Sequence, residues 1–210
     1  SLLNEKKWLL SIMEDAHVEM GQKRKYVSSE HDELRLDKPI LRPWFATPMP
    51  LRRKDAPLCT VVGGFTQPSI KANRNLVQRV LTIAQSTTAK RWLEFGAGCG
   101  NFTLPFGDHF DHVSATEIFP LAKEGLAMAI AQHRLGSKIE VLPVNLQRNT
   151  QMARNIISEH DALLVDPPRS GLHHSLNTLA EAKEQPKFIV YVSCHAESLS
   201  KDAHALQELG

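Results

Sequence analysis

The feature that most constrains the fold is a regular alternation of short apolar runs with amphipathic segments over residues 61–210. The apolar runs are rich in Val, Ile, Leu and Phe, and they fall at 91–95, 113–117, 139–143, 162–166 and 188–192. Such runs are typical of buried strands, whereas residues 73–86 carry their apolar side chains at helical spacing. The pattern predicts an α/β fold with a doubly wound, mainly parallel sheet whose strands are joined by right-handed helical crossovers.

Residues 1–60 have a different character. They open with an amphipathic stretch, continue through a charged middle and end in a segment punctuated by Pro39, Pro43, Pro48, Pro50 and Pro57. Prolines at this density prevent a continuous helix or a central strand, because each one fixes the backbone and lacks an N–H donor. We therefore expect an N-terminal appendage over residues 1–60, either a connector or the remnant of an upstream module. One main domain should follow over residues 61–210.

Length and composition narrow the class of protein. With 210 residues and 42% hydrophobic content, the chain can bury a full core. Its apolar stretches are much shorter than the ~20 residues that a membrane span needs, and its start lacks the pattern of a secretory signal. We therefore expect a cytoplasmic protein with no membrane partner. The three cysteines, Cys59, Cys99 and Cys194, are too few and too scattered for a disulfide framework or a metal cluster, so we expect free thiols.

Charge sets a limit on how nucleic acid could be bound. The formal net charge of +2 and the sequence pI of about 8.4 fall short of the strongly basic domain that holds nucleic acid by charge alone. Basic residues do cluster at 23–25 and 52–54. Each cluster is either a local contact to nucleic acid or a solvated face, and a solvated face is the commoner meaning of such a run.

The first predicted strand of the main domain runs into a glycine-rich loop. Gly96, Gly98 and Gly100 allow a sharp turn and a close approach of the backbone to a ligand. Glu117, at the end of the next predicted strand, is placed to accept hydrogen bonds from ribose hydroxyls. A dinucleotide loop of the GxGxxG form needs a glycine where Asn101 stands, so the tighter loop suits S-adenosylmethionine, which has no pyrophosphate. The alternative is a glycine-rich turn with no ligand.

Another predicted strand ends in Asp166-Pro167-Pro168-Arg169. Because the prolines fix the backbone and lack N–H groups, this turn offers a carboxylate and carbonyl groups beside the same pocket. In nucleic-acid amino-methyltransferases a similar turn is followed by an aromatic residue that stacks on the base. Here Arg169 follows, which favours recognition of a base carbonyl or a phosphate by a planar guanidinium. The alternative is a rigid turn without a ligand.

The last predicted strand delivers a cysteine to the same edge of the sheet. Tyr191-Val192-Ser193-Cys194 closes this strand, and cysteine is the strongest nucleophile among the neutral side chains. A buried, inert thiol is the alternative and the commonest fate of a free cysteine. The position of Cys194 beside His195, just before a predicted helix start, favours the nucleophile. Cys99 is expected to pack inside the glycine loop.

Taken together, these motifs resemble those of the S-adenosylmethionine-dependent RNA uracil-C5 methyltransferases. Their residues are most similar to those of the transfer-RNA branch of this family. The motifs are Phe65-Thr66-Gln67-Pro68, Gly98 to Leu104, Ala115-Thr116-Glu117-Ile118, Asp166 to Leu172 and Tyr191 to Cys194. The resemblance implies a Rossmann-like methyltransferase fold, S-adenosylmethionine as cofactor, an RNA substrate, and a catalytic domain over residues 61–210. It implies Cys194 as nucleophile and a cofactor site formed by Gln67, Gly96, Gly98, Asn101, Glu117, Asn145 and Asp166.

The chain departs from the family pattern in three places. His195-Ala196 follows the cysteine where family members usually have Asn-Pro, and Ser69 stands where Asn is common. The glutamate that removes the C5 proton belongs to a later family motif, which residues 1–210 do not contain. We therefore expect the catalytic domain to be cut at its C-terminal end and the general base to lie beyond Gly210.

The chemistry explains why a cysteine is needed. Uracil C5 becomes a good nucleophile only after a thiolate adds to C6 and creates an enolate. Two alternatives remain open from the residues alone. The chain could methylate another atom while Cys194 is structural, or it could be a noncatalytic module that binds the cofactor or RNA.

Overall fold

The computed structural model of the chain describes strands within residues 17–44 and 58–61, and then residues 67, 69–148 and 150–209. Several features of the sequence fall outside these described residues. They are the amphipathic opening, the side chains of both basic clusters, and residues Phe65, Thr66 and Pro68.

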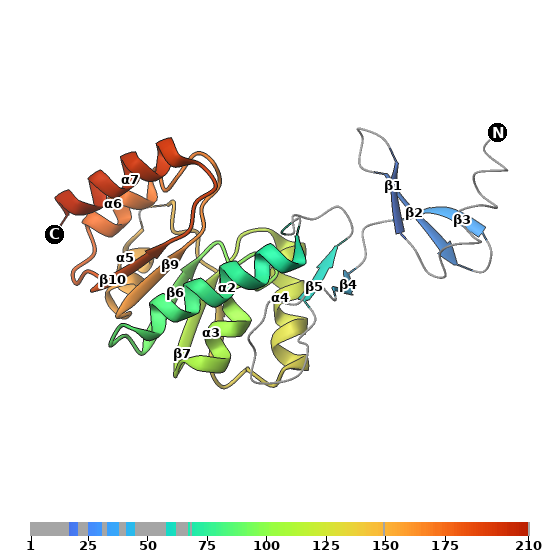
Figure 1. The fold of residues 1–210 in the computed structure, drawn as a ribbon, viewed down its shortest axis with the longest axis horizontal. Helices are drawn as coiled ribbons and strands as arrows, with labels where there is room; N and C mark the ends of the chain where they lie inside the picture. The colour runs from blue at the N-terminus through green and yellow to red at the C-terminus, as the bar shows by residue number, and fades with distance from the viewer. Residues whose placement is uncertain are drawn as a thin grey trace.

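The first strands of the chain form two small antiparallel arrangements. One is a three-stranded sheet of His17–Met20 (β1), Lys25–Glu30 (β2) and Glu33–Asp37 (β3), and the other pairs Leu41–Trp44 (β4) with Leu58–Val61 (β5). Figure 1 shows that β1, β2 and β3 are not part of the main sheet. Leu58 and Cys59 of β5 are buried in the core of the main domain. A domain boundary near residue 60 stays a prediction.

The main domain is built on a five-stranded parallel sheet in the order β10-β9-β6-β7-β8. Its strands are Arg91–Phe95 (β6), His112–Thr116 (β7), Ile139–Leu142 (β8), Ala162–Val165 (β9) and Phe188–Tyr191 (β10). Each of them coincides with a predicted strand to within a residue or so at either end. The prediction of a doubly wound, mainly parallel α/β fold is therefore confirmed.

Helices fill the gaps between these strands. They are Ile70–Gln85 (α2), Thr103–His109 (α3), Pro120–Gln132 (α4), Gln151–Ser158 (α5), Ser175–Ala180 (α6) and Ala196–Glu208 (α7). Ser69 caps the first of them, because its hydroxyl accepts a hydrogen bond from the backbone N–H of Ala72 at 3.3 Å. Serine and asparagine are both good N-cap residues, so the replacement of the family's asparagine by Ser69 keeps the helix capped.

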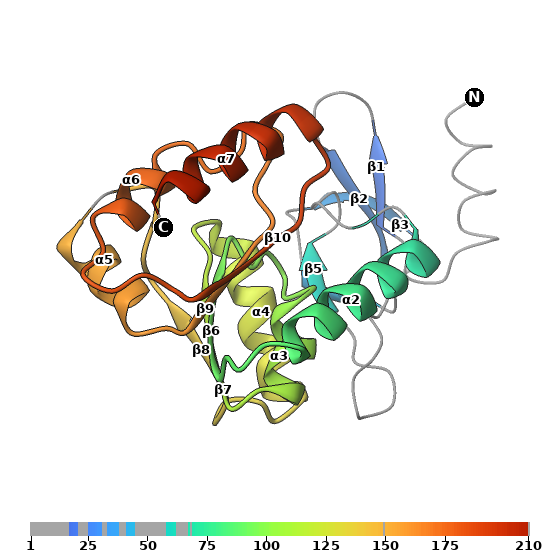
Figure 2. The same ribbon diagram turned by 60° about the vertical axis from the view of Figure 1, so that its left-hand side comes forward.

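Helices cover both faces of the sheet, which explains why its strands are mostly apolar, and the inner strand β9 is buried at every residue. In β9, Ala162 and Leu164 belong to one core cluster, whereas Leu163 and Val165 belong to the other, as the two-residue period of a strand requires. The first cluster packs against α2, α3 and α4, and the second against α5, α6 and α7. Figure 2 shows α5, α6 and α7 together on one side of the strands and α2 and α3 on the other.

This topology creates one position where the strand order reverses. From β6 the chain proceeds outward through β7 and β8, and then it returns to add β9 and β10 on the opposite side of β6. In open α/β sheets, ligands bind at such a switch point, outside the carboxyl ends of the strands. The turns that follow β6, β7, β9 and β10 are therefore the ones to inspect for a site.

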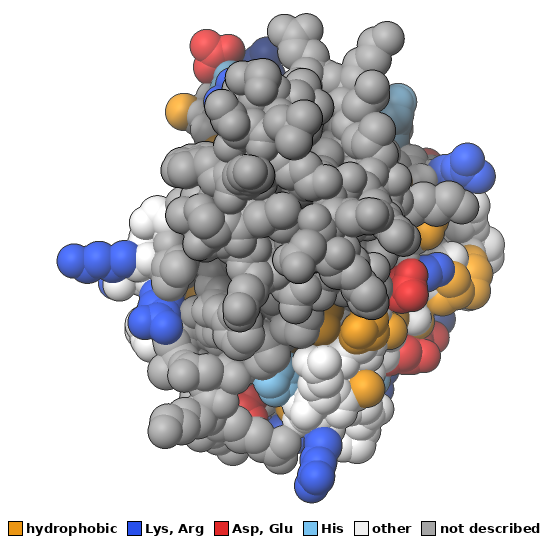
Figure 3. All heavy atoms as spheres, turned by 90° about the vertical axis from the view of Figure 1, so that its right-hand side faces the viewer, with side chains coloured by type: hydrophobic (Ala, Val, Ile, Leu, Met, Phe, Trp, Pro, Cys, Tyr) orange, Lys and Arg blue, Asp and Glu red, His pale blue; other side chains and the backbone are white. Residues whose placement is uncertain are grey.

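The surface adds two observations. On the face shown in Figure 3, the Lys and Arg side chains of the described residues stand apart and form no single patch. Among the described residues, no helix combines the length and the apolar character required to cross a bilayer, and no group of His, Cys, Asp and Glu is arranged to hold a metal ion.

Candidate active site

A pocket opens at the switch point. Its walls come from the loops after β6 (residues 95–96), β7 (116–118), β8 (144–147) and β9 (166–168 and 171–172), and Ser175 of α6 completes them. Four residues predicted to hold a cofactor line this pocket: Gly96, Glu117, Asn145 and Asp166. The turns of four neighbouring parallel strands therefore converge on one site, as the sequence predicts.

The glycine loop turns where its glycines adopt left-handed backbone conformations. Gly96 has φ +69°, Gly98 has φ +56° and Gly100 has φ +98°. At Gly100 a Cβ atom would also lie only 2.7 Å from Leu126 Cδ1, so a larger residue there is excluded by both conformation and space. The loop can thus pass close to a ligand before it enters α3.

Glu117 holds two walls of the pocket together. Its Oε2 accepts a hydrogen bond from the Gly98 backbone N–H at 2.7 Å, and its Oε1 accepts one from the Phe119 backbone N–H at 2.6 Å. A carboxylate has about four acceptor positions, so each oxygen can still accept another hydrogen bond. Glu117 therefore both fixes the loop and keeps capacity for ribose hydroxyls.

Three of the predicted cofactor residues are not among those that line the pocket: Gln67, Gly98 and Asn101. Gly98 is joined to the pocket only through the hydrogen bond that its backbone N–H donates to Glu117. Asn101 exchanges two side-chain hydrogen bonds with Asn73 of α2, at 2.7 and 3.0 Å, and these anchor the glycine loop to that helix. Gln67 is half-buried just before α2. Direct cofactor contact by these three residues stays a prediction.

The pocket contains further polar groups besides Glu117. Asn145 is oriented by its own loop, because its Oδ1 accepts a hydrogen bond from the Gln147 backbone N–H at 2.9 Å. Asp166 follows β9 directly, and its burial raises the pKa of the carboxyl to about 6. A raised carboxyl pKa in a pocket of this kind is typical of functional sites.

Glu94 is a feature that sequence reasoning did not single out. It lies in β6 next to Phe95 and is only 3% exposed. Burial raises the pKa of Glu94 to about 8, and the carboxylates of Asp166 and Glu117 act in the same direction, although a 2.6 Å hydrogen bond from the Thr103 hydroxyl opposes them. The wall of the pocket is therefore backed by a carboxyl group that is largely protonated at neutral pH.

Sequence reasoning also missed the roles of Thr116 and Ile118. The Thr116 hydroxyl donates to the Glu94 carbonyl at 3.1 Å and accepts from the Gly96 N–H at 3.4 Å, which ties the ends of β6 and β7 together. Ile118 presents an apolar side chain at the pocket with 64% of its surface exposed. Thr116 and Ile118 flank Glu117 at the end of a predicted strand, and this position could have indicated that they belong to the site.

Cys194 is the accessible thiol of the chain. It is exposed in the turn between β10 and α7, whereas Cys59 is buried and Cys99 is partly buried. Burial raises the pKa of Cys99 to about 11, which keeps that thiol protonated and unreactive. Of the three cysteines, only Cys194 is therefore placed to act on a large substrate, although it is not among the residues that line the pocket.

The residue after the cysteine caps the next helix. His195 is the N-cap of α7: its Nδ1 accepts a hydrogen bond from the Ser198 N–H at 3.4 Å, and its carbonyl accepts one from the Ser198 hydroxyl at 3.2 Å. The Ser193 hydroxyl closes the turn by donating to the His195 carbonyl at 3.0 Å. A histidine thus performs the capping that asparagine, the usual family residue, also performs well.

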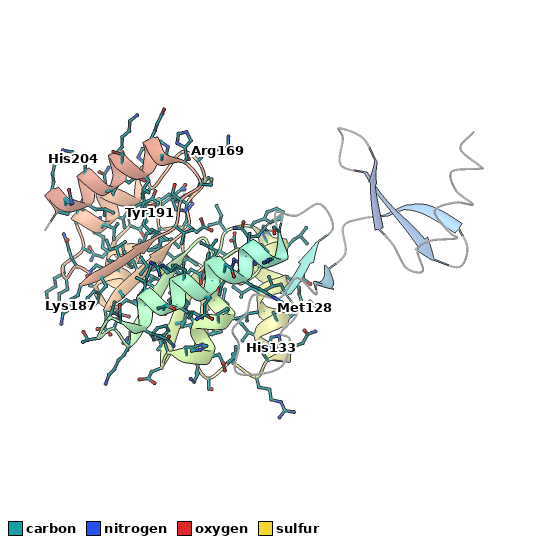
Figure 4. The ribbon with its side chains drawn as sticks, viewed as in Figure 1. Met128, His133, Arg169, Lys187, Tyr191 and His204 are labelled. Carbon is teal, nitrogen blue, oxygen red and sulfur yellow. The ribbon has the colours of Figure 1, made fainter. Side chains whose placement is uncertain are left out.

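Arg169 belongs to the turn after β9 but not to the pocket wall. Its side chain is exposed, and Figure 4 shows it extending outward from the domain. This position is compatible with contact to a substrate approaching from outside, and recognition of a base or a phosphate by Arg169 stays a prediction.

Comparison of the chain with known proteins bears on what this site does. A profile of the tRNA (uracil-5-)-methyltransferase family matches residues 44–209. An uncharacterised RNA methyltransferase of Bdellovibrio bacteriovorus is 33% identical over 219 residues, which is 100% of this chain and 55% of that protein. A 23S rRNA (uracil(1939)-C(5))-methyltransferase of Thiobacillus denitrificans is 35% identical over 146 residues, 68% of this chain and 32% of the relative. The chain thus spans about half the length of one curated relative and a third of the other.

Solved structures share the fold. A tRNA (uracil-54, C5)-methyltransferase of Pyrococcus abyssi, in complex with S-adenosyl-L-homocysteine, superposes with a TM-score of 0.59 at 22% identity, over 82% of this chain and 39% of that one. A precorrin 8W decarboxylase of Methanobacterium thermoautotrophicum superposes with a TM-score of 0.56 at 17% identity, over 72% and 77% of the two chains. Since one fold carries different reactions, the fold alone does not decide the activity.

The match to the family profile, unlike the fold, bears on the activity. It covers both the glycine loop and the turn with Cys194, and its members transfer methyl groups from S-adenosylmethionine to uracil C5 in RNA. The chain belongs to the tRNA (uracil-5-)-methyltransferase family.

Proposed function

We propose that this chain binds S-adenosylmethionine in the pocket at the switch point and methylates uracil C5 in RNA, with Cys194 as the covalent nucleophile. The observation that carries the proposal is the arrangement at the carboxyl edge of the sheet. There the turn that exposes Cys194 follows β10, and the neighbouring strand β9 ends in Asp166, which lines the nucleoside-type pocket together with Glu117 after β7. The family match supports the same reaction.

The residues of the pocket fit the cofactor. Glu117 can accept hydrogen bonds from ribose hydroxyls, and Ile118 offers an apolar surface to a base. Asn145 and Asp166 supply polar groups for the remaining donors of the ligand. When bound, S-adenosylmethionine supplies an electrophilic methyl group on a sulfonium centre.

The chain's own part of the reaction begins at Cys194. The Cys194 thiolate forms a bond to uracil C6, and the electron pair of the C5–C6 double bond moves toward the C4 carbonyl as an enolate. C5 would then form the new bond to the methyl carbon while the bond between that carbon and the sulfonium sulfur breaks, which would leave S-adenosylhomocysteine. Loss of the C5 proton to a base and breakage of the C6–S bond restore the ring and release the Cys194 thiolate.

The RNA substrate is proposed to be transfer RNA, from the wording of the motifs and from the family description. Ribosomal RNA is a second candidate, because relatives at 30–35% identity are named as 23S rRNA methyltransferases. In either RNA the target uracil must leave its stack, which costs a few kcal/mol. Arg169 is the residue that we assign to contact with the extruded nucleotide or its phosphate. A cytoplasmic location and a connector role for residues 1–60 belong to the same proposal.

The test is release of tritium from RNA labelled at uracil C5, because only substitution at C5 frees that hydrogen. Release requires a base for the C5 proton, so we expect it with a protein that contains residues 1–210 together with the glutamate motif of the family, and we expect none when Cys194→Ala is made in that protein. Transfer RNA and a 23S rRNA fragment serve as parallel substrates. The RNA from which tritium is released faster identifies the substrate class. Methyl transfer without tritium release would show that another atom is methylated, and cofactor binding without any transfer would indicate a binding module.

A further inference from the structure

A buried aspartate on α7 stands out because the mechanism above does not use it. Asp202 is 7% exposed, and it is the one buried residue of α7, a helix that the structure describes throughout. A carboxylate is costly to bury unless its oxygens accept hydrogen bonds. The partners of Asp202 therefore indicate why it lies there.

Those partners come from two different segments. Asp202 Oδ2 accepts a hydrogen bond from the Leu172 backbone N–H at 2.7 Å and another from the Tyr191 hydroxyl at 2.6 Å. Leu172 lies in the loop after β9, and Tyr191 is the last residue of β10, which Figure 4 shows between the sheet and α7. Burial, and then the hydrogen bond to Asp202, raise the pKa of Tyr191 well above its usual range, so its hydroxyl stays a donor.

The neighbouring glycine makes this approach possible. Gly171 has φ +82°, and a Cβ atom there would overlap Asp202 Oδ2. Only glycine leaves room for the carboxylate to reach the Leu172 N–H. The backbone of the loop is thus shaped to receive Asp202, and a 2.9 Å hydrogen bond from the Gly171 N–H to the Pro168 carbonyl closes its turn.

These contacts join the pocket to the cysteine. The loop that Asp202 holds contributes Pro167, Pro168, Gly171 and Leu172 to the pocket wall. Tyr191 ends the strand before Cys194, and α7, which carries Asp202, begins directly after it. One carboxylate oxygen therefore links the wall of the pocket to both chain segments that flank the nucleophile.

We propose that Asp202 is a positioning residue that keeps the turn bearing Cys194 in register with the cofactor pocket. This rests on the proposed function, because it assumes that Cys194 and the pocket act on one substrate. The thiolate bonds to C6 while C5 must face the methyl group, so the two sites have to be aligned. A misplacement of about 1 Å in such an arrangement can slow a reaction by roughly 100-fold.

The experiment measures covalent capture of RNA in which uridine is replaced by 5-fluorouridine. Its C5–F bond is not broken as a C–H bond is, so the thiol is not expelled and the adduct remains. Asp202→Ala removes both hydrogen bonds, Tyr191→Phe removes one, and Asp202→Asn keeps an acceptor oxygen of similar shape. At saturating RNA and S-adenosylmethionine we expect Asp202→Ala to slow capture at least ~10-fold, with Asp202→Asn within about 3-fold of the parent and Tyr191→Phe between them. The half-saturating RNA concentration should change much less than the rate.

Asp161→Ala is the matched control. Its Oδ2 also accepts two hydrogen bonds, both of 3.0 Å and both from backbone N–H groups, those of Lys90 and Arg91, but at the opposite edge of the sheet. The variant Asp161→Ala should lower the unfolding free energy without slowing covalent capture of the RNA. If Asp202→Ala captures RNA as fast as Asp161→Ala does, or if Asp202→Asn loses as much as Asp202→Ala, the positioning role is wrong.

Amide hydrogen exchange separates this proposal from the proposed function. Asp202→Ala should speed exchange about 10-fold or more in both 167–172 and 191–195, whereas Asp161→Ala should leave both segments unchanged. A parent chain that captures no RNA would contradict the proposed function, and the exchange result alone would then decide. Unchanged exchange in either segment overturns the coupling by Asp202.

Discussion

At the scale of single residues, the site depends on carboxyl groups whose roles differ because their surroundings differ. Glu117 lies at the surface of the pocket and accepts hydrogen bonds from two backbone N–H groups. Glu94 is buried behind the pocket and receives the Thr103 hydroxyl. Asp202 is buried on α7 and joins two loops. Similar side chains therefore have different surroundings and hydrogen-bond partners, and the roles that we propose for them differ accordingly.

Glu117→Ala should weaken binding of S-adenosylhomocysteine by about 1.5 to 3 kcal/mol, the order expected when hydroxyl groups lose a charged acceptor. The measurement is titration calorimetry. Glu124→Ala, which removes an exposed glutamate of α4, is the control and should bind as the parent does. Equal affinities for Glu117→Ala and the parent would remove Glu117 from the cofactor site.

Glu94 predicts a pH dependence of stability. Because its pKa is raised from 4.5 to about 8 in the folded state, the folded chain binds more protons than the unfolded chain between these values. The unfolding free energy should therefore fall as pH rises from about 5 to 8. The pKa of Asp166 is raised to about 6, so this residue should also make the unfolding free energy fall as pH rises from about 4 to 6.

Glu94→Gln, which cannot titrate, should flatten the part of this fall between about pH 6 and 8. Urea denaturation at several pH values measures it. A slope in Glu94→Gln equal to that of the parent over this range would show that Glu94 does not carry the raised pKa.

At the scale of elements, the strands were predictable and the buried polar contacts were not. The five strands of the main sheet follow from short runs that are rich in apolar residues, because a strand covered on both faces is mostly apolar. The positions of Gly96, Glu117 and Asp166 in the pocket follow from the predicted strand ends, whereas Asn145 was expected only from the family resemblance. Asp202 and Glu94 could not be found in this way, since a charged residue on a helix or in a strand reads as solvated until the opposing element is known. The strands β1 to β3 were not predicted, although the alternation of apolar and charged residues in β3 is typical of a half-buried strand.

Gly171→Ala tests the fit of the loop after β9 against α7. A left-handed conformation costs a non-glycine residue roughly 1–2 kcal/mol, and the clash with Asp202 adds to this. We expect a loss of at least ~2 kcal/mol in unfolding free energy by urea denaturation. Gly136→Ala, at a glycine with no atom within 4 Å of a Cβ, should change it by less than ~0.5 kcal/mol. Similar values for the two variants would show that the loop moves away from α7 without cost.

At the scale of the whole molecule, charge indicates how RNA is held. The formal net charge of the chain is only +2. RNA should therefore bind weakly and with strong dependence on salt. If Arg169 contacts a phosphate, Arg169→Ala should lower the slope of log affinity against log salt by about 1. Filter binding that stays tight in high salt would contradict this, and an unchanged slope would assign Arg169 to the base or to solvent.

The measurement that tests the central claim most directly is a denaturing gel of the chain incubated with S-adenosylmethionine and 5-fluorouridine-substituted transfer RNA. The parent should give a shifted, covalent protein–RNA band, and Cys194→Ala should give none. Cys99→Ala should keep the band, because that thiol is partly buried with its pKa raised to about 11. A band that persists in Cys194→Ala, or tritium release from uracil C5 by that variant, would contradict the assignment of Cys194 as the nucleophile.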